Sequence, residues 1–410
     1  MKKMLLALLL AALWALPALA AQDTVRIFLW DNDAGETAQQ APAAVMDDSY
    51  NSRYVWADSR DGNLNIYGRI WSRKLDPVTG TFLANRVQVD EHQQDQPDVA
   101  GTVRDFFFVV WQDTLLKGGE PTQPFVRKFD GLGKPMSDEV RVTEKPYGNA
   151  KYPKVAVNKR TQDFVVVWQD NRDGNWDIWA RLFDYKLEPR TGDIKINDDG
   201  LKVPHILPAV SFTEAGIAIV WQDNRDGASK SDIYYRYFKP DLSPVTSGKR
   251  VNSDLERFHV TPSVAASDTG YFTVVWLSFQ NHLYGDVYAQ RFYPDGSANQ
   301  TNIKVNLSSD PVACRIPTVA MGTDNVSFWT SWADSSSSTY RYQIRARYFD
   351  RNARFNPTVK VVNDNWYYGQ RAPDVCRYGN FFSVAWLDSC RANGRGDIFG
   401  QYYVLNQDKD

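Results

Sequence analysis

The carboxylates in this sequence that could do chemistry follow a repeated tryptophan. An Asp lies two residues after that tryptophan in six places: Asp58, Asp113, Asp170, Asp223, Asp334 and Asp388. Such Asp-rich loops could offer oxygens to calcium, although their spacing does not match the alternation of a calcium-binding loop. The alternative is turn chemistry, in which Asp accepts backbone N–H bonds, Gly adopts a positive φ and Arg pairs with the carboxylate. Because the pattern recurs, we favour turn chemistry. We predict no metal site and no cofactor, with calcium as the one ion to consider.

These tryptophans mark an internal repeat. They are spaced 53 to 57 residues apart and number seven: Trp56, Trp111, Trp168, Trp221, Trp276, Trp332 and Trp386. A proline precedes each apolar run with a spacing of 54 to 56 residues: Pro42, Pro97, Pro153, Pro208, Pro262, Pro317 and Pro373. Each unit reads as four short strands separated by Gly, Asp, Asn and Pro. Four strands in about 50 residues is typical of propeller blades.

The repeat predicts an all-β fold, a seven-bladed β-propeller with four-stranded antiparallel blades. It forms one domain over residues 21–404, and residues 405–410 are a short polar tail. The last unit stops after its third strand, whereas a strand-like segment precedes the first unit. We therefore expect Thr24–Trp30 to pair with Asp397–Val404, so that the N-terminal strand joins the last blade and closes the ring. Each repeated tryptophan should fill the space between two blades.

The first 20 residues have the pattern of a secretory signal peptide. Lys2 and Lys3 precede an apolar stretch from Leu5 to Ala15, and small residues form a cleavage site at Ala18–Ala20. We expect a secreted or periplasmic protein with no membrane span. Cleavage would leave 45 basic and 49 acidic residues. This balance gives no sign of a nucleic-acid partner, and we expect a monomer.

Residues that break the repeat are candidates for ligand binding. The residues just before each proline should surround one mouth of the central channel. Two and three positions before the proline, five of these residues are basic or histidine: Lys151, His205, His259, Arg315 and Arg371. They would give that mouth a positive bias and could attract an anionic ligand, such as an acidic sugar or a carboxylate-bearing peptide. The alternative is that they are solvated rim residues without a ligand. The two histidines alone are a weak metal signal.

Three cysteines remain after the repeat is accounted for. Cys314 and Cys390 belong to the same face of adjacent predicted blades, so we predict a disulfide between them. Cys376 should be buried and free.

The phrase VVWxDxRDGxxDIYxRxFD, followed by a VN strand and then PxVA, resembles the repeat of exported bacterial propeller proteins. Those repeats are loosely similar to sialidase-type propellers and to the periplasmic propeller of the Tol system. The Ser-x-Asp-x-Gly-x-Thr-Trp boxes of sialidases are absent here. Sialidases use an arginine triad and a tyrosine nucleophile, and the resemblance places Arg315, Arg371 and Tyr152 in that general zone. It does not assign them those roles.

Three functions remain open. The first is an exported, non-catalytic propeller that binds a protein or carbohydrate on its loop-bearing face, and the sequence favours it over an enzyme. The unequal loops between second and third strands support it, because varied loops on a constant core make a specific surface. The second is a carbohydrate-active enzyme, a glycoside hydrolase or polysaccharide lyase, with its site at the channel mouth. The third is a structural envelope component.

Overall fold

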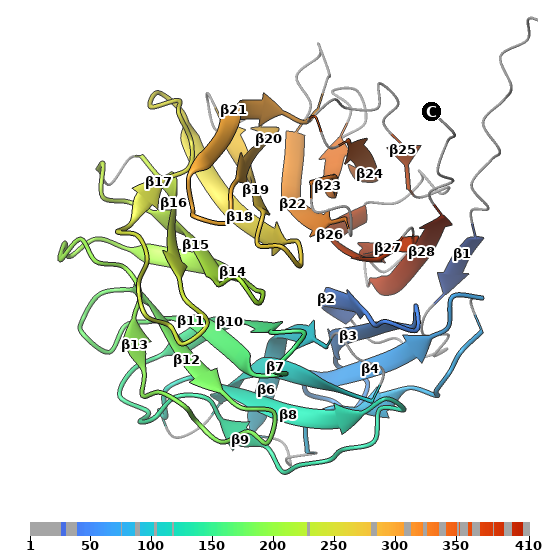
Figure 1. Ribbon diagram of the computed structural model, residues 1–410. Coiled ribbons are helices and arrows are strands. Elements are labelled where there is room, and N and C mark those ends of the chain that lie inside the picture. The colour runs from blue at the N-terminus through green and yellow to red at the C-terminus, as the bar shows by residue number, and fades with distance from the viewer. Residues whose placement is uncertain are drawn as a thin grey trace, which may run out of the picture.

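The computed structural model describes most of the chain beyond residue 38. The described residues are 26–29, 39–74, 76–86, 91–101, 105–116, 119–227, 230–279, 285–306, 313–322, 326–335, 342–350, 352, 360–362, 370–379, 381–388 and 396–404. They form seven four-stranded antiparallel sheets arranged in a ring (Figure 1). No helix that could cross a bilayer occurs among them. The predicted seven-bladed β-propeller is confirmed.

Each blade runs from an inner strand beside the central channel to a short outer strand. Blade 1 contains β2 (Gln39–Met46), β3 (Ser52–Asp58), β4 (Asn65–Trp71) and β5 (Phe82–Leu83). Blade 2 contains β6 (His92–Ala100), β7 (Phe106–Leu115), β8 (Gln123–Asp130) and β9 (Val140–Arg141). Blade 3 contains β10 (Ala150–Val157), β11 (Phe164–Asp170), β12 (Asp177–Phe183) and β13 (Ile194–Lys195).

The next three blades repeat this order. Blade 4 contains β14 (His205–Phe212), β15 (Ile217–Asp223), β16 (Asp232–Phe238) and β17 (Lys249–Arg250). Blade 5 contains β18 (Phe258–Ala266), β19 (Phe272–Phe279), β20 (Gly285–Phe292) and β21 (Ala298–Lys304). Blade 6 contains β22 (Ala313–Met321), β23 (Phe328–Ser335), β24 (Tyr342–Phe349) and β25 (Lys360–Val361).

Blade 7 combines the two ends of the described chain. It contains β26 (Gln370–Tyr378), β27 (Phe381–Asp388), β28 (Asp397–Val404) and β1 (Arg26–Leu29). Strand β1 pairs antiparallel with β28, which places Arg26 opposite Tyr402 and Leu29 opposite Phe399 (Figure 1). The predicted closure of the ring by the N-terminal strand is confirmed.

The closing contact between blades 7 and 1 repeats a hydrogen bond found elsewhere in the ring. The Gln39 N–H donates to the Gly396 carbonyl at 3.2 Å, as the His205 N–H donates to the Trp176 carbonyl at 2.8 Å between blades 3 and 4. Gln39 Oε1 also accepts the Ile398 N–H at 2.7 Å. The join between the first and last blades therefore has the same backbone geometry as an internal one.

The core lies between blades. All seven repeated tryptophans are at most 1% exposed. Each packs against the preceding blade, as Trp168 does in a cluster with Phe108 and Val126 of blade 2. Since a single four-stranded sheet cannot bury both faces, its stability depends on its neighbours.

The residue before each repeated proline adopts a left-handed conformation, which the sequence did not predict. Its φ lies between 43° and 54° in all seven blades, at Ala41, Gln96, Tyr152, Leu207, Thr261, Ile316 and Ala372. The pairing register shifts across each of these sites, so each is a β-bulge, where a strand tolerates proline. The freed N–H of Tyr152 donates to Gln112 Oε1 of the preceding blade at 2.9 Å. The bulge re-aims the inner-strand side chains beside the channel.

Candidate functional site

Three of the repeated Asp residues, Asp58, Asp170 and Asp223, form turns, in agreement with the turn-chemistry interpretation. Asp170 accepts Trp168 Nε1–H at 3.1 Å and the Arg172 backbone N–H at 2.8 Å. Arg172 Nη2 lies 2.6 Å from Asp170 Oδ2. Asp58 and Asp223 make the same set of contacts. These oxygens are occupied by donors of their own blade.

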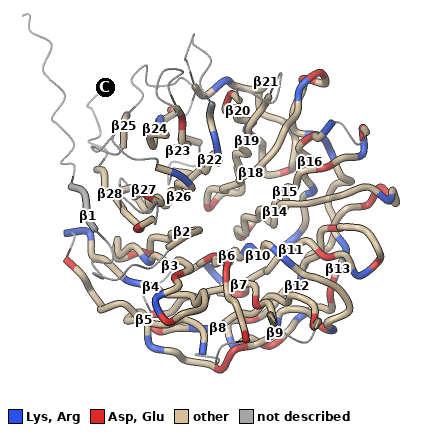
Figure 2. Tube along the Cα trace, turned by 180° about the vertical axis from the view of Figure 1, so that it is seen from behind, with Lys and Arg blue, Asp and Glu red and all other residues tan. Residues whose placement is uncertain are grey.

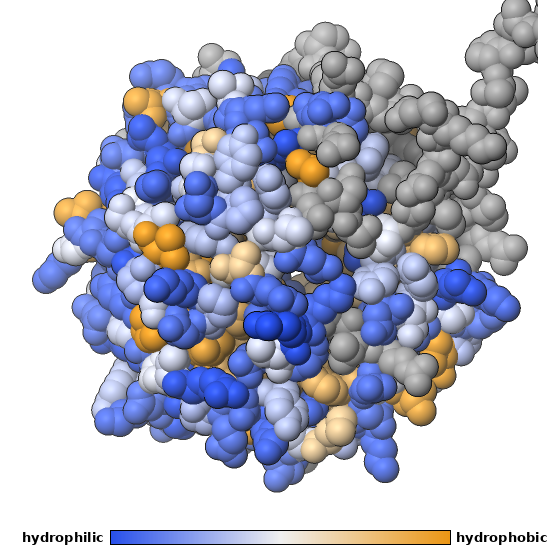
Figure 3. Space-filling model, in the orientation of Figure 1, coloured by the Kyte–Doolittle hydropathy of each residue, from blue (hydrophilic) through white to orange (hydrophobic). Residues whose placement is uncertain are grey.

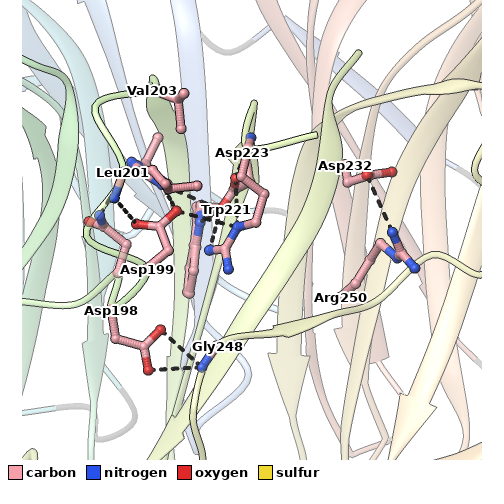
Figure 4. Close-up of polar contacts among 12 residues, drawn as sticks. Asp198, Asp199, Leu201, Val203, Trp221, Asp223, Asp232, Gly248 and Arg250 are labelled. Carbon is pink, nitrogen blue, oxygen red and sulfur yellow. Dashed lines mark hydrogen bonds and ion pairs between the residues drawn. The ribbon is translucent and has the colours of Figure 1, made fainter. Parts of the chain in front are cut away.

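His205 is not at the channel mouth, where the sequence analysis placed it. Its side chain is fully buried between blades 3 and 4. The Nδ1 atom lies 3.2 Å from Asp177 Oδ1, and Nε2 lies 2.9 Å from Asp199 Oδ2 and 3.5 Å from Asp223 Oδ2. Figure 4 shows the carboxylates of Asp199 and Asp223 converging beside Trp221. The prediction was wrong because the residue three positions before the proline points between blades.

The carboxylates around His205 determine its charge. Burial alone would lower the pKa of His205, but the Asp177 hydrogen bond and the charges of Asp223 and Asp199 outweigh burial and raise the pKa. Both ring nitrogens can then donate to carboxylates. The three carboxylates around the ring therefore favour the protonated form of His205.

Asp199, His205 and Asp223 also offer ligand atoms that lie within 4.8 Å of one another, a spacing that a metal ion could use. The equivalent position in three other blades is a glutamine that donates Nε2–H to the Asp after the tryptophan. These pairs are Gln39–Asp58 at 3.0 Å, Gln94–Asp113 at 3.3 Å and Gln370–Asp388 at 3.2 Å. Since a donor faces the Asp in these three blades, we assign His205 to donation toward its neighbouring carboxylates.

His259 is also buried, at 1% exposure, and so is not a mouth residue. Ser278 replaces the usual Asp in this blade, and Trp276 Nε1–H donates to His259 Nδ1 at 3.1 Å instead. The Nε2 atom lies 2.8 Å from the Asp254 carbonyl. Burial lowers the pKa of His259. An unprotonated Nδ1 that accepts from tryptophan fits a neutral ring.

The other candidates differ in their exposure. Lys151 is half-buried, whereas Arg315 and Arg371 are exposed. The Arg315 guanidinium is held on its own blade, since Nε donates to the Tyr342 hydroxyl at 2.6 Å. Tyr152 is 36% exposed and lines the channel. Of the predicted set, Tyr152 alone lines the cavity described next.

A cavity of about 390 Å³ occupies the channel at the bulge end of the inner strands. Figure 3 shows one face of the ring and the hollow at its centre. One side of the cavity is lined by Pro208, Pro262 and Pro317 with small or apolar neighbours. The other side carries charge, and we name its three residues the charged ring: Asp98, Lys154 and Asp374. Each comes from a different blade, at the position directly after the repeated proline.

The charged ring was missed by the sequence analysis. Lys154 Nζ lies 3.4 Å from Asp98 Oδ1. Each carboxylate also accepts a backbone N–H of the next blade, with Val155 donating to Asp98 at 2.8 Å and Ala44 donating to Asp374 at 2.7 Å. The available signal was the variable residue of the proline motif. It is small or uncharged in four blades, as Ala43, Ala209, Ser263 and Thr318, and charged in the other three.

Burial raises the pKa of Asp374 to about 7; the Lys154 charge lowers it, and the Asp98 charge raises it further. Burial would lower the pKa of Lys154, but the Asp98 and Asp374 charges outweigh this effect and raise it. The Lys154 side chain is nevertheless 42% exposed to the channel. The cluster therefore combines charges surrounded by protein with access from the cavity.

A second cavity of about 500 Å³ lies at the other end of the inner strands. It shares Val99, Val155 and Val210 with the first cavity. Lys159 of blade 3 reaches Asp268 of blade 5, with Nζ 3.0 Å from Oδ2, and lies 5.2 Å from the Tyr378 ring centroid of blade 7. This lysine therefore links three blades at the end opposite the charged ring.

Cys314 and Cys376 are both buried free thiols. Cys376 is thus as predicted. Cys314 packs in the apolar cluster between blades 5 and 6 and does not show the predicted bridge, while its expected partner, Cys390, lies outside the described residues. Burial raises the pKa of both thiols, which makes them unreactive.

No protein-family model and no curated protein sequence matches the chain. Among solved structures, a protein of unknown function from Dyadobacter fermentans DSM 18053 is similar, with a TM-score of 0.53, 12% identity and coverage of 78% of this chain and 98% of that one. A PL25 ulvan lyase bound to -[GlcA(1-4)Rha3S]- gives a TM-score of 0.58 at 8% identity, with coverage of 90% and 94%. The polysaccharide lyase Uly1 gives 0.52 at 8% identity, with coverage of 89% and 90%. At these identities the likeness shows the fold alone.

Proposed function

We propose that this protein is an exported, non-catalytic β-propeller that binds a carbohydrate at the channel mouth, with one end of the glycan inserted toward the charged ring. The observation that carries this proposal is the cavity of about 390 Å³, which has polar, charged residues on one side and prolines on the other. A sugar ring has hydroxyl groups at its edge and C–H groups on its faces, so it matches such a two-sided wall. A concave site of this size suits a small ligand better than a broad protein surface.

Two residues at the mouth support this proposal further. Tyr152 lines the cavity and offers an aromatic face, held in place by the bond from its backbone to Gln112. Thr261 lines the opposite side, and its Oγ1 is buried without a hydrogen-bond partner in the described structure. A ligand hydroxyl could satisfy that group. The similarity in fold to polysaccharide lyases agrees with a carbohydrate ligand.

The test is a glycan array followed by titration calorimetry. Tyr152→Ala should weaken binding by about tenfold, which is about 1.4 kcal/mol, because it removes the aromatic face against which the C–H face of a sugar would pack. Tyr293→Ala is the matched control, since Tyr293 is 40% exposed but does not line the cavity. Equal losses in the two variants, or no glycan binding at all, would contradict the proposal.

A carbohydrate-active enzyme is the second candidate, and the charged ring is the observation that favours it. Burial raises the pKa of Asp374 to about 7, and two carboxyl groups that line one sugar site can act as acid and base. A turnover assay on glycosides and polyuronates separates the two candidates. Product release that is lost in a folded Asp374→Asn variant supports the enzyme, whereas binding without product supports the binding protein.

A further inference from the structure

We infer that the sugar residue inserted into the channel carries a primary amino group, so that the preferred ligand is an amino sugar with a free ammonium. This inference rests on the proposed carbohydrate site and specifies its ligand. It follows from the charges that line the cavity and from the way in which they are held.

The charged ring contains two carboxylates and one ammonium. The cavity lining includes Asp98, Asp374 and Lys154, and the other described residues of the lining carry no formal charge. When all three groups are ionised, the cavity has one net negative charge. Lys154 neutralises one of the two carboxylates, and a ligand cation would neutralise the other.

The geometry places both carboxyl groups at the cavity wall, where a ligand cation would shift Asp374 toward its ionised form. Asp98 and Asp374 each accept a backbone N–H from the next blade, which fixes their position but brings no positive charge. The lysine contact is long, at 3.4 Å between Nζ and Asp98 Oδ1. One ammonium group, with one long contact to Asp98, cannot fully compensate two carboxylates.

The titration of Asp374 agrees with this incomplete compensation. Its pKa is raised to about 7 by burial and by Asp98, although Lys154 opposes the shift. On its own strand Asp374 lies two residues from the buried thiol of Cys376 and three residues from Arg371 and Arg377. Strands β14, β18 and β22 contribute uncharged side chains to the cavity. A second cation in the channel would therefore favour the ionised form of Asp374.

An acidic ligand fits this cavity poorly, in contrast to the expectation from the rim residues. A ligand carboxylate would add a third negative charge beside Asp98 and Asp374. Arg315 is engaged with Tyr342 and does not line the cavity, and the predicted histidines are buried between blades. In the part of the chain that the structure describes, charged residues of both signs are spread around the ring (Figure 2).

The experiment compares matched sugars by titration calorimetry. The probes are short oligomers of glucosamine, of N-acetylglucosamine and of glucose, together with glucuronate, all at about pH 6, where the free amino group is protonated. We expect the glucosamine oligomer to bind about tenfold more tightly than its N-acetylated form, since an opposite charge near the protein surface contributes on the order of one to a few kcal/mol. Binding of the amino sugar should also release protons, because it favours ionised Asp374.

Variants with opposite expected effects test the role of the charged ring. Asp374→Asn should abolish the preference for the amino sugar. Lys154→Met should increase that preference, because it removes the competing cation. Asp295→Asn, which removes an exposed turn carboxylate that does not line the cavity, should leave the preference unchanged.

The outcomes distinguish this inference from the proposed function. Tighter binding of glucuronate or of a neutral sugar, or an unchanged preference in Asp374→Asn, overturns the amino-sugar inference and leaves the carbohydrate site intact. Failure of every sugar to bind overturns both.

Discussion

Replacement of His205 tests whether the buried cluster between blades 3 and 4 contains an imidazolium. His205→Ala removes a group that contacts Asp177, Asp199 and Asp223 and leaves these buried carboxylates with less compensation. Loss of one partner from a buried ion pair costs about 3–5 kcal/mol. Because Arg225 still contacts Asp199 and Asp223, we expect the lower end, about 3 kcal/mol.

His205→Gln is the informative companion, because glutamine occupies this position in blades 1, 2 and 7. It retains a donor to Asp223 but cannot carry a charge, so we expect a smaller loss of about 1–2 kcal/mol. The two variants together separate the hydrogen bond from the charge.

The pH dependence gives the decisive measurement. The pKa of His205 is raised in the folded state, so its stabilising contribution is fully present below the unfolded pKa of about 6.5 and is lost as the pH rises through the folded pKa. The difference in unfolding free energy between the wild type and His205→Gln should therefore be largest below about pH 6.5 and shrink as the pH rises through the folded pKa. Denaturant unfolding followed by tryptophan fluorescence at several pH values measures it, and titrations common to both proteins cancel. A difference that stays constant with pH would refute the reasoning and mean that His205 is neutral.

Three further predictions concern the ring itself. Trp168→Ala should destabilise the fold by about 3–5 kcal/mol, measured by thermal unfolding, because the side chain is fully buried between blades; a loss below about 1 kcal/mol would contradict its role as an inter-blade plug. Ala372→Gly should be neutral or stabilising by up to about 1 kcal/mol, whereas Ala372→Val should be destabilising, since φ is 47° there; the reverse order in melting temperature would argue against the strained bulge. Deletion of residues 21–29 should lower the melting temperature and promote association that light scattering detects, because β28 would lose its partner strand and expose a sheet edge. A deletion variant with an unchanged melting temperature that stays monomeric would be evidence against closure of the ring by β1.

The fold could be predicted from the sequence because two markers kept one period through seven units. The tryptophan positions gave the number of blades, and the missing and spare strands at the two ends gave the closure between Arg26–Leu29 and Asp397–Val404. Repetition makes such inferences strong, since an error in one unit is corrected by the others. The turn role of the repeated Asp residues could be predicted for the same reason.

The site was harder to predict because side-chain direction depends on the bulge. Proline disfavours the helical region at the preceding residue, and extended backbone is the usual expectation there. The observed left-handed residue changes the local register, and a shift of one residue exchanges the two faces of a strand. His205 and His259 were therefore placed at the mouth although they lie between blades, and Asp98, Lys154 and Asp374 were overlooked although they line the channel.

The pairing of β1 with β28 also governs the order in which the molecule can assemble. These partners are separated by more than 360 residues along the chain, so their contact is the most distant in sequence of the strand pairings. The outermost strand of blade 7 is synthesised first, but it has nothing to pair with until synthesis reaches the last strand. Before β1 and β28 pair, the first and the seventh blade each expose an apolar face to solvent. Closure of the ring buries both faces against each other in one step.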